Sequence, residues 1–394
     1  MQPIEFIAPY YYSTVYYIVL LVLSWATTLY YVGSNGQKLL YKHESDPSQG
    51  AAIFFTILLI FFVGLRQYTR DFGDTQSYAN RYQVMREYMP VSYQTEWLWS
   101  NMQTFFRTVM GMNATDFFTV VAFGFFGGML FCSIKWTGRN LWLSILFFCT
   151  TFQTFSFAVN GIRNGLGCSL VLIAISLMED KSNKPKLLCI LILMFMALGI
   201  HRSTLLPSVA SLLSFFFFKD TKFALRFWLA SIAISLVAGN AVENFFASLG
   251  FDDRMGGYSN AQFDESNADR FSHTGFRWDF LLYSTFPVIM VWYVTHIRRF
   301  NNPTFNLIAN TYLFCNAFWI MVIRAAYSNR FAYLSWFIYP MVIAYPLLRM
   351  NIWKDQDRRT ALILFAYSGF TFFMFFVYYF GTTGFKGFDQ YWWK

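Results

Sequence analysis

Charged side chains are scarce in this sequence. Asp, Glu, Lys and Arg together make up 13% of its 394 residues, whereas a soluble domain usually carries about a quarter. Hydrophobic residues make up 56% and aromatic residues 22%, and they lie in long runs separated by short polar loops. This pattern excludes an ordinary soluble protein and predicts a polytopic membrane protein. The net charge of +9 then indicates loops that face anionic lipid, and no nucleic-acid partner is expected.

Several chemical signatures are absent as well. The five cysteines all fall in apolar runs without metal-ligand spacing, so the sequence predicts neither a disulfide nor a metal site. No P-loop, H-E-x-x-H or G-x-S-x-G motif occurs where it could function. There is no internal repeat and no soluble second domain, so residues 1–394 are expected to form one integral membrane domain. The first apolar run lacks a basic flank and a small-residue cleavage site, and we expect a retained span.

The apolar runs themselves define the expected fold. Because a helix needs about 20 apolar residues to cross the hydrocarbon, they predict an all-α bundle of about twelve transmembrane spans. The expected segments are 10–33, 50–65, 114–134, 141–158, 164–178, 187–200, 204–218, 224–248, 278–295, 304–323, 331–348 and 360–380. Short loops rich in Lys and Arg stay in the cytoplasm. This rule places the loop 34–50 and every second loop after it inside, and both chain ends outside.

Lysine and arginine are distributed differently between the two predicted sides. Nine of the eleven lysines fall in cytoplasmic loops, whereas about twelve of the nineteen arginines fall on the outer side. Lysine suffices to orient a span, but arginine stays charged and offers a planar fork that fits phosphate oxygens. The outer arginines therefore predict a phosphate-bearing ligand on that side. The alternative is that they pair with outer acidic residues or with lipid headgroups.

Two outer segments are long. Residues 66–113 are expected to contain an amphipathic helix that lies at the membrane surface. Its apolar face would be formed by Trp97, Leu98, Met102, Phe105 and Phe106. Residues 249–277 are polar and dotted with aromatic residues, which favours an outer loop that covers a site or grips sugar rings, or else a plain solvated loop.

The first polar group at an outer span end comprises Arg66, Arg70, Asp71 and Asp74. Its D-x-x-D pair would bind a metal, or supply a general base and a carboxylate that orients an arginine. No D-x-D occurs in this loop, which disfavours the metal. The simpler alternative is Arg–Asp pairing that ties the loop down.

Two further groups lie in turns between spans. Asn160 and Arg163 flank the start of a helix, where an arginine adds its charge to the positive helix end and suits a phosphate. The alternative is a snorkelling arginine. His201 and Arg202 follow an apolar run, and a neutral imidazole there could take a proton from a sugar hydroxyl or donate to a phosphate oxygen. The alternative is a hydrogen-bonded structural histidine.

A fourth group surrounds a late outer turn and contains Arg324, Tyr327 and Arg330. The two arginines stand six positions apart, so they converge only if the turn folds over the site. Together, the four groups predict one anion-binding site on the outer side, where guanidinium groups hold a lipid-linked pyrophosphate.

These motifs resemble the EpsG-like branch of the Wzy-type polysaccharide polymerases. Asn164 stands where the family pattern has Gln. The resemblance lies in Gly64-Leu65-Arg66, Gly73-Asp74-Thr75 with Tyr78, Gly161-Ile162-Arg163-Asn164, the KSNKPK loop, His201-Arg202-Ser203 and Asn329-Arg330-Phe331-Ala332-Tyr333.

The resemblance implies a GT-C-like, inverting and metal-independent glycosyltransferase without a cofactor. Such an enzyme would move a growing glycan from undecaprenyl pyrophosphate onto the non-reducing-end sugar of a lipid-linked repeat unit, producing an O-antigen, capsule or exopolysaccharide. The site would face the periplasm, in the outer leaflet of a bacterial inner membrane. The implied partners are donor and acceptor undecaprenyl-pyrophosphate-linked oligosaccharides, membrane lipids and a chain-length regulator protein.

On this interpretation His201 is the expected base, and Asp74 and Asp71 are the further catalytic candidates. The expected pyrophosphate- and glycan-binding residues are Arg66, Arg70, Tyr78, Asn160, Arg163, Arg202, Tyr327, Arg324 and Arg330.

Three alternatives stay open. A flippase for lipid-linked oligosaccharide should show charge inside its spans and a pseudo-repeat between its halves, whereas here the charges gather at one set of helix ends. A GT-C enzyme with a polyprenyl-phosphate sugar donor usually carries a D-x-D-like or D-E pair in its first outer loop, which D-x-x-D matches poorly. A membrane-bound O-acyltransferase would use the histidine on an acyl donor.

Overall fold

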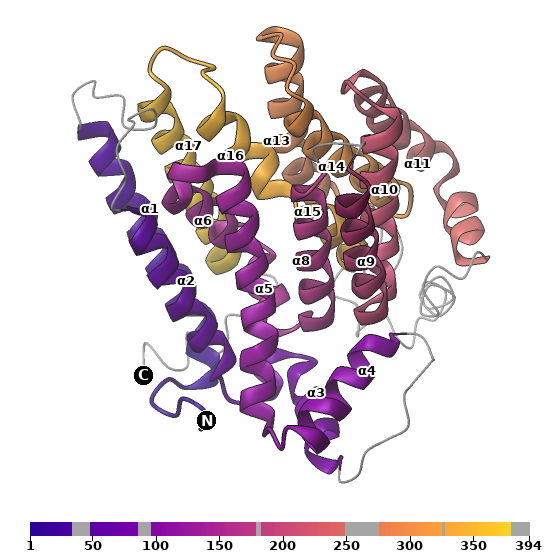
Figure 1. Cartoon of the computed structure of the whole chain (residues 1–394). Coiled ribbons are helices and arrows are strands. Elements are labelled where there is room, and N and C mark those ends of the chain that lie inside the picture. Colours follow the sequence, from indigo (N-terminus) through magenta and orange to yellow (C-terminus); the bar gives the residue numbers. More distant parts are fainter. Residues whose placement is uncertain (34–47, 86–95, 179–182, 249–275, 325–327, 380–394) are drawn as a thin grey trace.

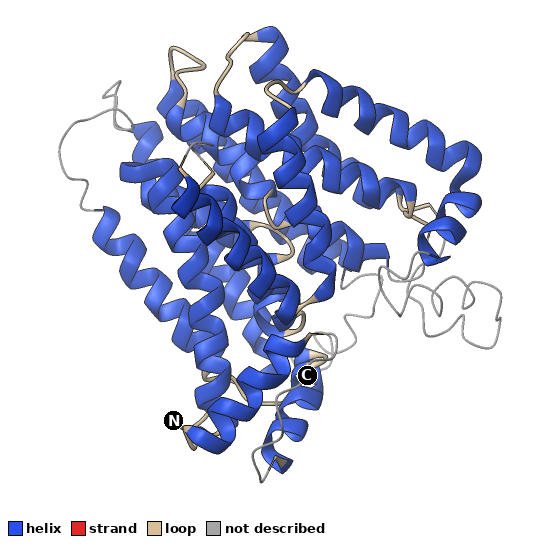
Figure 2. Ribbon diagram, turned by 45° about the vertical axis from the view of Figure 1, so that its right-hand side comes forward, coloured by secondary structure: helices blue, strands red, loops and turns tan. Residues whose placement is uncertain are grey.

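The computed structural model describes residues 1–33, 48–85, 96–178, 183–248, 276–324 and 328–379. Within these ranges the chain is helical and contains no strand, as Figure 2 shows. The all-α prediction is therefore confirmed for the described residues. The predicted outer loop 249–277 lies almost entirely outside them.

The long helices run side by side as a bundle, and α3 and α4 lie at one end of it (Figure 1). The helices are α1 (Tyr12–Gly33), α2 (Ser48–Gly64), α3 (Thr75–Val84), α4 (Trp97–Thr104), α5 (Ala114–Thr137), α6 (Leu141–Thr150), α7 (Thr154–Val159), α8 (Ile162–Ser176), α9 (Lys184–Ile200), α10 (Leu205–Phe217), α11 (Lys222–Ser248), α13 (Trp278–Trp292), α14 (Pro303–Met321), α15 (Ser328–Trp336), α16 (Tyr339–Arg349) and α17 (Gln356–Phe373).

Among the described residues, six helical stretches are long and apolar enough to cross a membrane, which makes this a multi-pass membrane protein. They are Pro9–Gly33, Ala114–Thr150, Lys222–Gly239, Trp278–Ile297, Arg330–Arg349 and Gln356–Phe376. Each of the twelve expected segments coincides with one helix or a pair of helices. Several of these helices are short, so the number of twelve spans stays a prediction.

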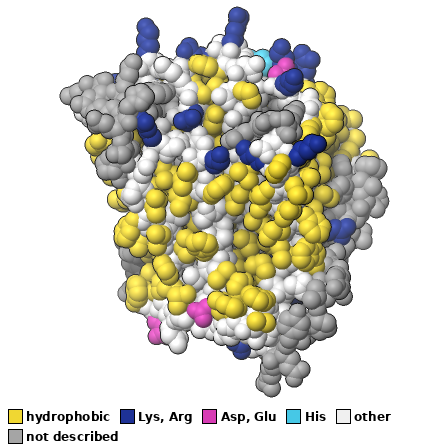
Figure 3. Space-filling model, viewed as in Figure 1, with side chains coloured by type: hydrophobic (Ala, Val, Ile, Leu, Met, Phe, Trp, Pro, Cys, Tyr) yellow, Lys and Arg dark blue, Asp and Glu magenta, His cyan; other side chains and the backbone are white. Residues whose placement is uncertain are grey.

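The surface of the bundle is banded. On the face drawn in Figure 3, hydrophobic side chains cover the middle, and Lys and Arg side chains gather along the upper edge. That edge is the end of the bundle opposite α3 and α4 (Figure 1). A hydrophobic surface of this kind is what a helical bundle presents to lipid.

Two of the expected spans are interrupted rather than continuous. The segment 141–158 divides into α6 and α7 because the backbone becomes extended at Thr151. The hydroxyls of Tyr16 and Tyr17 donate to the carbonyl oxygens of Cys149 and Phe152 at 2.8 and 3.2 Å. Carbonyl oxygens near the break therefore have hydrogen-bond partners from the protein where no water is available.

The segment 331–348 likewise divides, into α15 and α16. The two breaks meet in the interior, where the Gln153 side chain donates to the Trp336 carbonyl oxygen. The interrupted span α6–α7 therefore satisfies part of the backbone of α15–α16.

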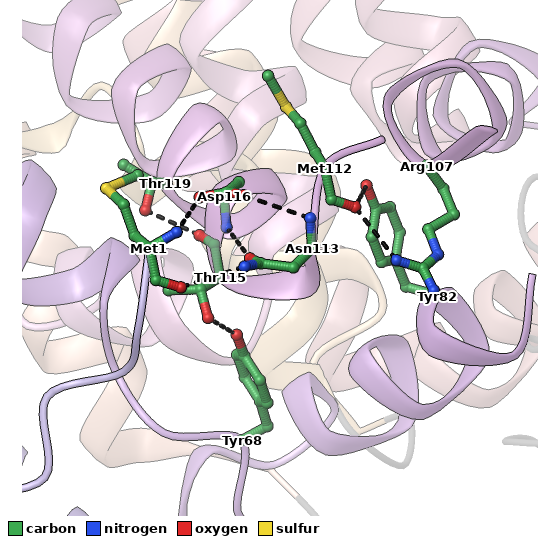
Figure 4. Close-up of polar contacts among 9 residues, drawn as sticks. All are labelled: Met1, Tyr68, Tyr82, Arg107, Met112, Asn113, Thr115, Asp116 and Thr119. Atoms are coloured by element: carbon green, nitrogen blue, oxygen red, sulfur yellow. Dashed lines mark hydrogen bonds and ion pairs between the residues drawn. The ribbon is translucent and has the colours of Figure 1, made fainter. Parts of the chain in front are cut away.

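The start of α5 fastens the segment 66–113 to the bundle, as Figure 4 shows. Asn113 and Asp116 form a capping box there. Tyr82 of α3 donates to the Met112 carbonyl oxygen at 3.2 Å, and Arg107 donates to the same oxygen at 3.5 Å. The Tyr68 hydroxyl shares a hydrogen bond with Thr115 of α5, which holds the segment on the long helix.

The predicted amphipathic helix is present as α4, followed by a π-helical turn at Phe105–Val109. Leu98, Met102 and Phe106 pack against buried residues of α3 and α5, whereas Phe105 is 46% exposed. Most of the apolar face is therefore turned to the protein. Its position at a membrane surface stays a prediction.

Two adjacent glycines of α5 provide a test of this packing. A Cβ at Gly128 would overlap Ser169 Oγ of α8, whose hydroxyl donates to the Gly124 and Phe125 carbonyl oxygens, whereas a Cβ at Gly127 meets nothing within 4 Å. We expect Gly128→Ala to lower the free energy of unfolding by about 1–3 kcal/mol. Gly127→Ala should leave it unchanged or raise it by up to about 1 kcal/mol. Thermal unfolding in detergent measures both, and equal midpoints for the two variants would contradict the α5–α8 contact.

Candidate active site

The site is built where the loop after α2 meets the end of α7. Arg66 lies in that loop and is 1% exposed. Its guanidinium donates to the Val63 carbonyl oxygen at 2.7 Å, to Thr75 Oγ1 at 2.9 Å and to the Val159 carbonyl oxygen at 3.2 Å. Arg66 therefore joins the end of α2, the start of α3 and the end of α7.

Burial also affects the charge of Arg66. Desolvation lowers the pKa of its guanidinium from the ordinary value to about 10, so the group is still charged at neutral pH. Two phenylalanine rings, of Phe72 and Phe118, lie 5.7 and 5.4 Å from the guanidinium carbon. The sequence suggested that Arg66 binds the pyrophosphate, but the structure places its side chain inside the protein as a tie between segments.

A glycine turn brings the Asp74 segment onto the residues before α8. Gly73 has a φ of +57°, a conformation that favours glycine, and a Cβ there would lie 2.7 Å from Asn160 Cγ. Asn160 Oδ1 accepts a hydrogen bond from the Asp74 backbone N–H at 3.0 Å. Two of the sequence motifs are therefore in direct contact.

The carboxylates of the D-x-x-D pair are exposed. Asp71 Oδ2 accepts a hydrogen bond from Thr69 Oγ1 at 2.8 Å. Asp74 contacts Asn160 through its backbone. Among the described residues, no group of three or more His, Cys, Asp or Glu side chains is placed to hold a metal ion.

The centre of the site is a carboxylate that joins Arg163 to His201. Arg163 Nη1 pairs with Glu96 Oε2, and His201 Nδ1 lies 2.5 Å from Glu96 Oε1. Arg163 Nε donates to the Tyr78 hydroxyl at 2.8 Å, and the guanidinium lies over the Tyr78 ring at 5.1 Å. The Arg163, Glu96 and His201 side chains are 15%, 20% and 18% exposed. One half-buried cluster is thus formed by Tyr78 of α3, Glu96 at the start of α4, Arg163 of α8 and His201 at the end of α9. It is called the Glu96 cluster below.

Sequence analysis did not identify Glu96. The residue directly precedes the amphipathic helix, and only the apolar pattern of that helix was informative in the sequence. It is the N-cap of α4 and has a left-handed backbone, with φ 61° and ψ 37°, which is uncommon for a residue other than glycine. A single acidic residue at a helix start on the arginine-rich side is a signal that could have drawn attention to it.

Close packing of α4 on α9 places Glu96 beside His201. A Cβ at Gly199 would lie 2.8 Å from Leu98 Cβ and from the Trp97 ring. The Trp97 ring lies 5.5 Å from that of Phe195, also on α9. The glycine therefore lets the start of α4 approach the end of α9.

A family model described as the EpsG family matches residues 51–391 of this chain. The chain belongs to the EpsG family. No curated protein and no solved structure matches it.

The late arginines of this EpsG-family protein lie on other elements. Arg324 packs against Gly239 at the kink of α11, and its guanidinium carbon lies 5.9 Å from the centre of the Phe276 ring. Arg330 is exposed at the start of α15. Tyr333, three residues later, packs its ring 5.3 Å from Phe157 of α7. The start of α15 is therefore close to the helix that leads to Asn160. Tyr327 lies outside the described residues.

Two expected phosphate ligands, Arg70 and Arg202, are exposed. Arg202 directly follows His201 and begins the 3-10 turn Arg202–Thr204 that leads into α10. The structure thus brings together Tyr78, Arg163 and His201, with Asp74 held on Asn160 next to them, and turns Arg66 inward.

The Gly73–Asn160 contact can be tested with a matched pair of glycines. Gly73→Ala should push the Asn160 amide away from the Asp74 backbone. Gly111→Ala is the control, since Gly111 also has a positive φ, +64°, but a Cβ there meets nothing within 4 Å. We expect Gly73→Ala to lower the free energy of unfolding by about 1–3 kcal/mol more than the control does, measured by thermal unfolding in detergent. Equal losses would show that the contact does not contribute.

Proposed function

We propose that this protein is a polysaccharide polymerase, a GT-C-like inverting glycosyltransferase that moves a growing glycan from undecaprenyl pyrophosphate onto a lipid-linked repeat unit. The Glu96 cluster is the observation on which the proposal rests, because it joins an arginine and a histidine through one carboxylate. A departing pyrophosphate needs positive charge, and an attacking hydroxyl needs a proton acceptor. Membership of the EpsG family supports the same chemistry.

The pyrophosphate is proposed to bind at the start of α8. Arg163 uses Nε and Nη1 for Tyr78 and Glu96, and Nη2 has no recorded partner within the described ranges. Arg163 is the second residue of α8, where backbone N–H groups and the helix dipole favour an anion. The α8 N-cap, Gly161, provides no side-chain cap, which leaves these N–H groups for a ligand.

The other arginines have secondary roles in this proposal. Arg70 and Arg202, both exposed, are the candidates for further contacts to phosphate or glycan. Arg330 at the start of α15 and Arg324 at the α11 kink would approach the ligand from other helices. Arg66 is assigned to holding the loop, since its guanidinium is buried.

In the proposed step, His201 accepts the proton of the acceptor hydroxyl. The hydroxyl oxygen forms the new bond to the anomeric carbon on the face opposite the pyrophosphate. The bond from that carbon to the pyrophosphate oxygen breaks, and its electron pair leaves with the phosphate, so the configuration inverts. Arg163 stabilises the charge that develops on the leaving group. No metal or cofactor takes part. His201 is favoured over Asp74 because its imidazole lies in the Glu96 cluster beside Arg163, whereas the Asp74 carboxylate is exposed.

The surface charge supports an outward-facing site. Lys and Arg side chains gather at the end of the bundle opposite α3 and α4 (Figure 3), and such clusters usually mark the cytoplasmic side. The Glu96 cluster, which α3 and α4 help to form, would then face the periplasm of a bacterial cell. Donor and acceptor lipids would reach it from the outer leaflet, and a chain-length regulator is a further expected partner.

One observation favours a second function, a flippase for the same lipid-linked oligosaccharide. The interrupted spans α6–α7 and α15–α16 meet inside the bundle through Gln153 and Trp336, and transporters often use interrupted helices. A GT-C enzyme with a polyprenyl-phosphate sugar donor is the other alternative. An assay that measures both product length and lipid binding separates these functions.

The test uses purified protein in detergent and a synthetic undecaprenyl-pyrophosphate repeat unit from the same gene locus, with and without EDTA. A glycan ladder on a gel that survives EDTA is the expected result. A ladder abolished by EDTA would make Asp71 and Asp74 metal ligands instead. Tight lipid binding without a ladder would favour the flippase, and activity only with a polyprenyl-phosphate sugar would favour the other glycosyltransferase.

Within this assay, Arg163→Lys should lower turnover by about 10²–10³-fold, the usual effect of losing one preorganised group that stabilises developing charge. Lysine keeps the charge but cannot bond Tyr78, Glu96 and a phosphate in one plane. Arg226→Lys, on an exposed position of α11, is the matched control and should keep normal turnover. Unchanged polymer length and yield for Arg163→Lys would rule out its proposed role.

A further inference from the structure

We infer that Glu96 is a positioning residue that holds His201 in one tautomer, with the proton on Nδ1 and the lone pair on Nε2. The inference deepens the proposed function and rests on it for the role of His201 as base. It identifies His201 Nε2 as the atom that accepts the proton. It also adds Glu96, which none of the sequence motifs contains.

Hydrogen-bond chemistry decides which nitrogen of His201 carries the proton. An ionised carboxylate only accepts hydrogen bonds, and each nitrogen of a neutral imidazole either donates or accepts. His201 Nδ1 lies 2.5 Å from Glu96 Oε1, so Nδ1 must be the donor. Nε2 then carries the lone pair, and it has no recorded partner in the part of the chain that the structure describes. A histidine held in this way is prepared to accept a proton at Nε2.

Arg163 fixes the orientation of the Glu96 carboxylate. Glu96 uses one oxygen for Arg163 and the other for His201, which prevents rotation that would exchange them. Arg163 also gives the carboxylate an oppositely charged partner on its other oxygen. Glu96 is a charged group in contact with the imidazole, Arg163 pairs with its other oxygen, and Arg202 follows His201 in the sequence.

Placing Glu96 beside His201 requires a disfavoured backbone conformation. Its left-handed backbone is disfavoured for a residue with a side chain. The three side chains are only 15–20% exposed, so this is not the usual solvated surface ion pair, which contributes little. Close packing at Gly199 is needed as well. Strain of this kind persists where the surroundings hold a residue in one place, often at functional sites.

Glu96 and Arg163 would then stabilise the two opposite charges that develop in the reaction. When the acceptor hydroxyl gives its proton to Nε2, the imidazole becomes a cation whose Nδ1–H still bonds to Glu96. The carboxylate therefore stabilises the charge that His201 gains, and the Arg163 edge at Nη2 faces the charge that the pyrophosphate gains. After the products leave, Nε2 releases the proton to water.

The experiment has a readout that does not depend on substrate. Protein labelled with ¹⁵N-histidine is examined by NMR at neutral pH, and the His201 signals are assigned by their loss in His201→Asn. The wild type should show a protonated Nδ1 and an unprotonated Nε2. In Glu96→Gln, the side-chain amide can donate to Nδ1, so we expect the other tautomer to appear. Asp355→Asn removes an exposed carboxylate that caps no backbone group in the turn before α17, and it should leave the signals unchanged.

Turnover is measured on the same samples. We expect Glu96→Gln to lower turnover by about 10²–10⁴-fold with little change in KM for the lipid-linked substrate, as for the loss of a carboxylate that orients a histidine base. Glu96→Asp keeps the charge and should retain more turnover than Glu96→Gln.

Three results would overturn the inference. One is a wild-type His201 with its proton on Nε2, which can be seen even if the Glu96 variants do not fold. Another is a folded Glu96→Gln protein with normal tautomer and turnover. The third is tighter lipid binding at normal turnover in that variant, which would mean that Glu96 competes with phosphate. If the wild type makes no polymer but Glu96→Gln still changes the tautomer of His201, the positioning of His201 by Glu96 is supported and only the proposed function is contradicted.

Discussion

The arrangement of the candidate site depends on one buried charge. Arg66 is almost fully inaccessible, and its recorded acceptors are neutral oxygens of α2, α3 and α7. Removing a cation from water costs several kcal/mol. Three hydrogen bonds from a charged donor, each contributing about 1.5–3 kcal/mol, and the aromatic faces beside it offset that cost only while all the segments stay in place. The loop that carries Gly73 and Asp74 is held by this requirement.

From this anchor, the site is assembled from the ends of helices rather than from their middles. The loop after α2 contacts Asn160, α8 starts beside it with Arg163, and α9 ends at His201. The long apolar helices form a fixed frame, and the polar groups of the site lie in the turns and short helices at their ends. Glu96 connects the two sides of this arrangement through a short helix that packs on both α5 and α9. The acid, the arginine and the histidine are therefore positioned by packing, which is how preorganised sites limit rearrangement during a reaction.

Parts of this description were predictable and parts were not. The helical fold of the described residues and the contact between the Asp74 and Asn160 segments followed from apolar runs and from short motifs, whereas the roles of Arg163 and His201 stay predictions. Glu96 did not, because a single acidic residue in a loop gives no periodic or motif signal. The inward direction of Arg66 was also missed, since a sequence gives no indication of which side of a helix end faces the protein. The break between α6 and α7 was hidden because threonines and tyrosines that satisfy the backbone there do not interrupt the apolar pattern.

The sequence by itself determined that this is a helical, multi-pass membrane protein. Those properties follow from composition and local periodicity, which are fixed by the order of the residues alone. Only the tertiary structure decided which of the polar residues meet. Arg163, Glu96 and His201 come from positions far apart in the chain, and their contact depends on the packing of α4 against α9 at Gly199 and on the tie at Arg66. Such contacts arise from the way whole helices pack, and no local pattern encodes them.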